Sequence, residues 1–126
     1  MSPHAYPGGI YAVAFSPDGS LIAAGGWDKI IRLYDVNSGS RLAALEAPVQ
    51  DIWSLAFSPD GRWLAAAHDD KVVSVWDVAA KKNLALLRGH TSSVYAVAVS
   101  RDGRLLTSAG RDGAALLWTV DRIAAK

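Results

Sequence analysis

The chain has 126 residues and a mass of 13.3 kDa, enough for one domain with its own core. Hydrophobic residues make up 51% of it, which excludes a largely disordered chain, yet no apolar run approaches the roughly 18 residues of a membrane-spanning helix. The net charge is +1 and both signs are spread along the chain, so we expect neither a nucleic-acid partner nor a membrane partner.

Cysteine is absent, which excludes disulfides, thiolate metal sites and a cysteine nucleophile. The first nine residues lack the basic stretch and apolar core of a secretory signal peptide. We therefore expect a cytoplasmic protein.

The predicted elements are short strands separated by turns. Pro17, Asp18 and Gly19 form the first turn, because proline fixes φ, aspartate caps the turn and glycine tolerates a positive φ. The apolar runs on either side are too short and too rich in β-branched residues for helices. The strands expected in the first third of the chain are 10–16, 21–25, 30–36 and 41–46.

This pattern returns twice, each time at an offset of 42 residues. The turn sequence Ser16-Pro17-Asp18-Gly19 comes back at 58–61 and, with Arg101 in place of proline, at 100–103. Tyr34-Asp35-Val36 comes back at 76–78 and 118–120. The chain is thus predicted to be a single segment of three repeats, approximately 1–42, 43–84 and 85–126.

The repeats resemble those of the WD-repeat β-propeller family, in which each repeat has four strands, Gly-His early and Trp-Asp late. Gly89-His90 and Trp118 carry this signature in the third repeat, and Trp76-Asp77 carries it in the second. The resemblance implies an all-β fold of propeller blades, four-stranded antiparallel sheets, with three blades per chain.

The resemblance also implies a hydrogen-bonded tetrad within a blade. It would consist of His90, Ser108, Asp112 and Trp118 in the third repeat. The matching positions are degraded elsewhere, to Pro48, Ala66, Asp70 and Trp76 in the second repeat and to Tyr6, Ala24, Asp28 and Tyr34 in the first. Those two blades are expected to rely more on packing than on a buried polar network.

Three blades are too few for a propeller, which has typically 4 to 8. By register, Lys126 falls at the start of a fourth strand and Met1 matches the next position of that strand, so head-to-tail copies could close a ring. Two copies would turn about 60° per blade and three about 40°, against about 45° to 51° for the seven or eight blades of the family. This comparison narrowly favours a homotrimer of nine blades over a homodimer of six. The other interpretation is a fragment cut or engineered from a longer propeller.

Binding residues are expected on the top face of the propeller, near the central channel. The resemblance places them at Tyr11, Trp53 and Tyr95 of the inner strands, and at Trp27, Asp69 and Arg111 before the turn aspartates. Tyrosine and tryptophan offer rigid contact area with a polar tip, as binding hot spots do. The alternative is that these rings only pack between the inner strands.

Catalysis is not expected, and neither a cofactor nor a metal site is predicted. His68-Asp69-Asp70 contains suitable residue types, but it falls at a predicted turn where aspartate is ordinary. No nucleophile elbow, zinc-binding His pair or phosphate loop occurs in the sequence.

The sequence therefore predicts a non-catalytic scaffold that self-associates into a ring and binds an unidentified protein or peptide. The alternative is a self-assembling structural module, or an excised or engineered fragment, with no ligand of its own.

Overall fold

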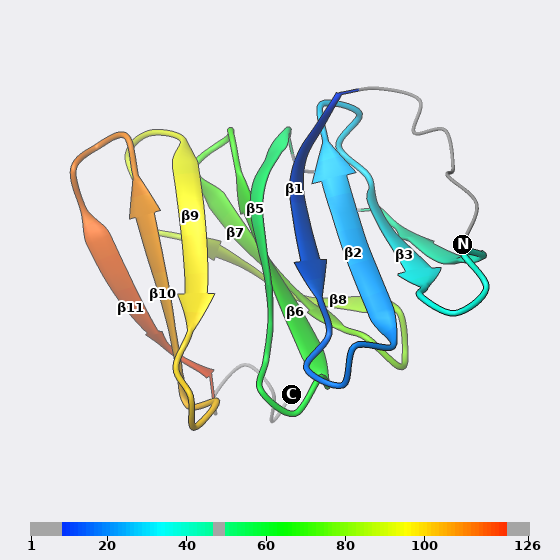
Figure 1. The fold of residues 1–126 in the computed structure, drawn as a ribbon. Helices are drawn as coiled ribbons and strands as arrows, with labels where there is room; N and C mark the ends of the chain where they lie inside the picture. Colours follow the sequence, from blue (N-terminus) through cyan, green and yellow to red (C-terminus); the bar gives the residue numbers. More distant parts are fainter. Residues whose placement is uncertain (1–8, 47–49, 121–126) are drawn as a thin grey trace.

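A computed structural model of the chain describes residues 9–46 and 50–120. These residues form three antiparallel sheets, which we call blades 1, 2 and 3 (Figure 1). Blade 1 contains β1 (Ile10–Phe15), β2 (Leu21–Gly26), β3 (Ile31–Asp35) and β4 (Arg41–Leu45). Blade 2 contains β5 (Ile52–Phe57), β6 (Trp63–His68), β7 (Val72–Asp77) and β8 (Lys82–Arg88). Blade 3 contains β9 (Val94–Val99), β10 (Leu105–Gly110) and β11 (Ala115–Thr119).

The all-β prediction is confirmed, and the strands of blade 1 begin and end within a residue of their predicted bounds. Blades 1 and 2 have four strands in sequence order, whereas the described part of blade 3 has three. The positions expected to start its fourth strand, including Lys126, lie outside the described residues.

The turn between the first two strands of each blade is built in the same way. In blade 1 the Gly19 amide donates to the Ser16 carbonyl at 2.9 Å, and Gly19 has a φ of 74°. Asp18 Oδ1 accepts hydrogen bonds from the hydroxyl of Ser16 and from the amide and hydroxyl of Ser20. These donors, the Ser20 amide first, lower the pKa of Asp18 to about 2.

The hydrophobic core lies between the blades rather than within them. The inner strands β1, β5 and β9 lie side by side, so blade 2 is covered on both faces (Figure 1). One face packs on blade 1 through Leu64 and Trp76, and the other packs on blade 3 through Trp63 and Val75. All six residues of β6 are buried as a result.

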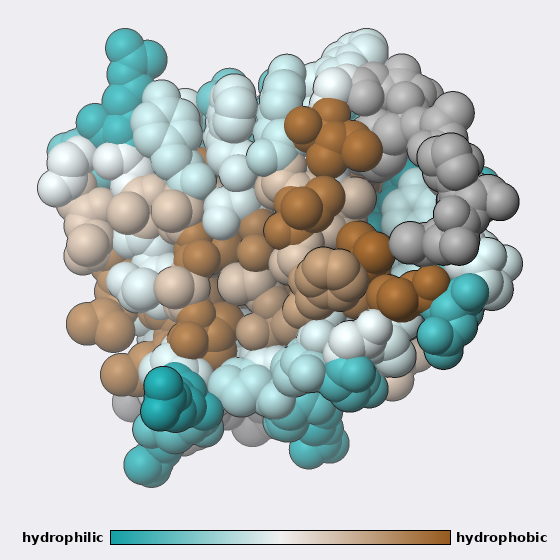
Figure 2. Space-filling model, in the orientation of Figure 1, coloured by the Kyte–Doolittle hydropathy of each residue, from teal (hydrophilic) through white to brown (hydrophobic). Residues whose placement is uncertain are grey.

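The outer faces of blades 1 and 3 leave apolar side chains exposed. In β1, Ile10 is 45% exposed, whereas its counterparts Ile52 and Val94 are both 0% exposed. In β11, Leu117 is 69% exposed, whereas its counterpart Val75 is 1% exposed. Figure 2 shows apolar surface following β1. At each end of the three-blade stack, one face of a blade is therefore exposed although the equivalent residues of another blade are buried.

Candidate functional site

Three of the predicted binding residues form a continuous aromatic row across the blades. The rings of Tyr11 and Trp53 are stacked, with centroids 4.7 Å apart and planes 13° apart. Trp53 meets Tyr95 edge to face, with a centroid distance of 6.0 Å. Tyr11 and Tyr95 are exposed and Trp53 is half-buried, so the row packs against itself while presenting one side to solvent.

A β-bulge near the start of each inner strand places these rings. The pairing of β1 with β2 shifts between Ile10 and Ala12, and that of β5 with β6 shifts between Ile52 and Ser54. The pairing of β9 with β10 passes over Tyr95 in the same way. A bulge leaves one residue outside the ladder and turns its side chain, so the skipped residue in all three strands is the aromatic one.

Asp69 fixes the central ring of the row. Trp53 donates from Nε1 to Asp69 Oδ1 at 3.0 Å. Ser93 donates its hydroxyl hydrogen bond to the same oxygen at 2.9 Å, which joins blade 2 to the loop before β9. Ser93 was not predicted from the sequence, because its role depends on a contact between neighbouring blades.

Trp27 and Arg111 lie at the two ends of this surface. Trp27 is 50% exposed and its amide donates to the Gly9 carbonyl at 3.3 Å. A side chain on Gly9 would lie 3.4 Å from both the Trp27 and the Tyr11 rings, so these two rings flank the same glycine. Arg111 is exposed, and its amide donates to the Ser93 carbonyl at 2.9 Å. The structure therefore gathers all six predicted binding residues at one end of the blades.

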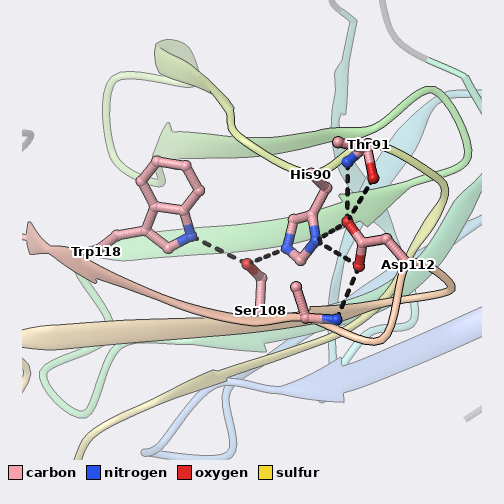
Figure 3. Close-up of polar contacts among 6 residues, drawn as sticks. His90, Thr91, Ser108, Asp112 and Trp118 are labelled. Atoms are coloured by element: carbon pink, nitrogen blue, oxygen red, sulfur yellow. Dashed lines mark hydrogen bonds and ion pairs between the residues drawn. The ribbon is translucent and has the colours of Figure 1, made fainter.

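In blade 3 the predicted tetrad is a hydrogen-bonded relay (Figure 3). Trp118 Nε1 donates to Ser108 Oγ at 3.0 Å, and the Ser108 hydroxyl lies 2.7 Å from His90 Nε2. His90 Nδ1 lies 3.2 Å from Asp112 Oδ2. The backbone amides of Thr91 and then Ala114 lower the pKa of Asp112 to about 2, so this carboxylate accepts and His90 donates from Nδ1.

Blade 2 has a buried relay of its own, which the sequence did not predict, although this blade was expected to rely more on packing than on a buried polar network. Trp76 Nε1 donates to Ser74 Oγ at 2.8 Å, and the Ser74 hydroxyl lies 2.7 Å from His68 Nε2. His68 Nδ1 lies 3.0 Å from the Gln50 carbonyl, which can only accept, so Nδ1 carries the proton. His68 is 0% exposed and ends β6, rather than lying in the turn where it was predicted.

The second relay has the same sequence of groups, an indole N–H, a serine hydroxyl and an imidazole, but its serine and histidine come from other positions of the repeat. His68 stands where blade 3 has Gly110, and Ser74 stands where blade 3 has Leu116. A side chain on Gly110 would come within 2.9 Å of His90 Nδ1, so a residue there is incompatible with a histidine arriving from the preceding loop. In blade 2 the histidine of the relay, His68, itself occupies the position that is Gly110 in blade 3. The signal in the sequence was a histidine in a column that otherwise holds glycine, and a polar residue, serine or arginine, in two of the three copies of the Leu116 column.

Blade 1 has an ion pair in place of a tetrad. Arg32, at the position of Ser74, donates from Nη1 to Asp28 Oδ2 at 2.6 Å and is buried. Blade 1 was likewise expected to rely more on packing than on a polar network, and this ion pair was not predicted from the sequence. Tyr6 and Pro48, which stand at the tetrad histidine position in blades 1 and 2, lie outside the described residues.

Within residues 9–46 and 50–120, no three His, Asp or Glu side chains gather as a metal site would require. In the same residues no helix is long and apolar enough to cross a membrane.

Comparison with protein families gives three matches to the WD domain, G-beta repeat, at residues 1–35, 39–77 and 81–119. The chain belongs to this family. Its WD repeats cover most of the chain, and each match ends on the last residue of the third strand of a blade.

Several relatives match this chain over about the length of one repeat. A probable serine/threonine-protein kinase, PkwA of Thermomonospora curvata, is 60% identical over 35 residues, which are 28% of this chain and 5% of the kinase. The cross-pathway control WD-repeat protein 2 of Flammulina velutipes is 50% identical over 44 residues, 35% of this chain and 14% of that protein. The small ribosomal subunit protein RACK1 of Schizosaccharomyces pombe is 46% identical over 46 residues, 36% of this chain and 15% of that protein. The matches thus span a small part of each relative.

Proposed function

We propose that this chain is a non-catalytic scaffold whose aromatic row binds a partner protein or peptide. The observation that carries the proposal is the continuous contact of Tyr11, Trp53 and Tyr95 across three blades, with one side exposed. Rings that are already ordered lose little side-chain entropy on binding. Trp27 and Arg111 extend the surface with a further indole and a cation.

The aspartates and histidines whose side chains would suit catalysis have structural roles in this fold. Asp18, Asp60 and Asp102 cap turns, and His68 and His90 belong to the two relays. The kinase relative matches over 5% of its length, so its named activity has no support from the matched repeat. The relatives named as ribosomal subunit proteins favour a cytoplasmic setting for this chain.

The binding proposal is tested with a phage-displayed library of random peptides selected on the wild-type protein. Selected peptides should bind Trp27→Ala and Trp53→Ala at least about tenfold more weakly, the loss of a single hot spot. Arg41→Ala, on the outer strand β4, is the matched control and should bind normally. Peptides that bind both tryptophan variants as tightly as wild type would contradict the proposal.

We further propose that the chain closes a ring by head-to-tail association, as a nine-bladed trimer in preference to a six-bladed dimer. The exposed positions on the open face of blade 3 correspond to the positions through which blade 2 packs on blade 3. Those on the open face of blade 1 correspond to the positions through which blade 2 packs on blade 1. The two faces therefore match one another rather than themselves, as a cyclic assembly requires.

The first measurement is absolute mass in solution, by light scattering coupled to size exclusion. A mass about three times 13.3 kDa would support the trimer, and about twice that value the dimer. A folded monomer would contradict ring closure. An assembled ring from which no peptide is selected would instead support the alternative, a self-assembling module without a ligand.

A further inference from the structure

A groove lies between blades 1 and 2 at the end of the blades opposite the aromatic row. Its volume is about 550 Å³. Blade 1 lines it with Leu21, Leu33 and Leu42, and blade 2 lines it with Val78 and the turns that follow β5 and β7. A volume of this size with mostly apolar walls and a few polar groups is typical of a ligand site.

The repeat supplies an internal comparison for this groove. The corresponding groove between blades 2 and 3 has a volume of about 340 Å³ and is lined by Trp63. Trp63 occupies the position that Leu21 has in blade 1, and its indole is buried against blade 3. The larger side chain fills at the second junction the space that remains open at the first.

Two cations stand at the rim of the open groove. Arg62 follows the glycine of the turn between β5 and β6, and Lys81 lies in the turn before β8. Within the described ranges neither side chain forms an ion pair or hydrogen bond. The groove also contains the Asp77 carboxylate, one of whose oxygens accepts from the Ala80 amide at 2.9 Å. Cations outnumber carboxylates in the lining, which favours an anionic group beside an apolar one.

We propose that this groove binds a short extended segment of another protein that carries a large apolar side chain next to an aspartate or glutamate. The apolar side chain enters between Leu21, Leu33 and Leu42. The neighbouring carboxylate reaches Arg62 and Lys81, and the guanidinium of Arg62 can hold it with two parallel hydrogen bonds. This site is separate from the aromatic row, so the two surfaces can be occupied together.

The proposal is tested by titrating the ¹⁵N-labelled protein with N-acetyl-Leu-Glu-amide and following the backbone amide signals. We expect saturable shifts at Arg62, Val78 and Ala79. N-acetyl-Leu-Gln-amide, which lacks the charge, and N-acetyl-Ser-Glu-amide, which lacks the apolar side chain, should each bind at least about fivefold more weakly. Unmoved signals at these amides, shifts centred on the aromatic row, or equal affinity for the glutamine peptide would overturn the proposal.

Matched variants separate the groove from other effects. Leu21→Trp copies the residue that blade 2 already carries at this position, so it should fill the groove and abolish the shifts. Arg62→Ala should weaken binding about fivefold, whereas Arg104→Ala, its counterpart at the next junction, should leave it unchanged. If Leu21→Trp fails to fold, the arginine pair still decides, because equal binding by Arg62→Ala and Arg104→Ala overturns the proposal.

Discussion

His68 is a buried histidine, and its hydrogen-bond partners within the described residues, the Gln50 carbonyl and the Ser74 hydroxyl, are both neutral. Burial lowers its pKa from the ordinary 6.5, with smaller opposing contributions from the Gln50 carbonyl and from Asp70. The folded protein therefore holds the imidazole neutral at pH values where the unfolded chain is already protonated. Since the unfolded state then binds more protons, the free energy of unfolding falls as the pH falls below about 6.5.

The lowered pKa of His68 predicts that part of the loss of stability at acidic pH is caused by this one residue. The free energy of unfolding of wild type should decrease between pH 7.5 and pH 5, and His68→Gln should remove part of that decrease while being less stable at pH 7.5. Urea unfolding followed by tryptophan fluorescence, at one protein concentration throughout, measures both values. An unchanged pH dependence in His68→Gln would contradict this account.

Lys71 is strained by the turn between β6 and β7. Its φ is 76°, in the left-handed region, where the matching residue of blade 3 is Gly113 with a φ of 80°. We expect Lys71→Gly to stabilise the protein by about 0.5 to 1 kcal/mol, because glycine adopts this conformation without a Cβ clash.

The matched control for Lys71→Gly is Lys82→Gly in β8, where φ is not positive. That change should destabilise by about 0.5 to 1 kcal/mol. The two variants should therefore differ in sign in thermal unfolding, and a destabilising Lys71→Gly would contradict the proposed strain.

At the scale of the blade, the two relays differ in burial. The two serines are equally buried, at 0% exposure for Ser74 and 1% for Ser108, but Trp76 is 2% exposed in the covered central blade whereas Trp118 is half-buried on β11. A lost hydroxyl leaves both an indole N–H and an imidazole nitrogen unpaired, and the cost rises as water is excluded.

We therefore expect Ser74→Ala to destabilise by about 1 to 3 kcal/mol, and Ser108→Ala by less. Ser92→Ala is the control, because the Ser92 hydroxyl makes no hydrogen bond within the described residues; it should cost below about 0.5 kcal/mol. Urea denaturation of the three variants ranks them. Equal losses for Ser74→Ala and Ser92→Ala would show that the second relay carries no stability.

The strands of this protein follow from local signals, but the second relay does not. The turns at Asp18, Asp60 and Asp102 repeat a short-range pattern of side chain and backbone, so spacing alone predicted the strands between them. His68 and Ser74 are brought together by the pairing of β6 with β7, and their match to Trp76 depends on which face of the blade each one occupies. A column-by-column comparison with blade 3 missed them because each has moved to another column.

At the scale of the molecule, the proposed head-to-tail interface joins two different faces. An aspartate placed on either face would be buried without a partner in the assembly, which costs several kcal/mol. Val13→Asp disables the face of blade 1 and Leu117→Asp disables that of blade 3. Each variant should remain near 13.3 kDa by light scattering.

Mixing the two variants gives the sharper result. Val13→Asp keeps a normal blade 3 face and Leu117→Asp keeps a normal blade 1 face, so an equimolar mixture should form a two-chain species and stop there. Arg88→Asp, at the exposed end of the outer strand β8 of the central blade, lies on neither open face and should assemble as wild type. A mixture that stays monomeric, or a Val13→Asp variant that assembles normally, would contradict head-to-tail closure.

The sequence by itself determined the family, the strand order and the aromatic identity of positions 11, 53 and 95, because a 42-residue repeat records each of these three times. Tertiary structure decided which side chains meet. The stacking of Tyr11 on Trp53, the bridge from Asp69 to Ser93 and the groove left open by Leu21 all depend on neighbouring blades. A repeat pattern specifies each blade separately, whereas contacts between blades depend on differences between the copies, and packing reveals these differences.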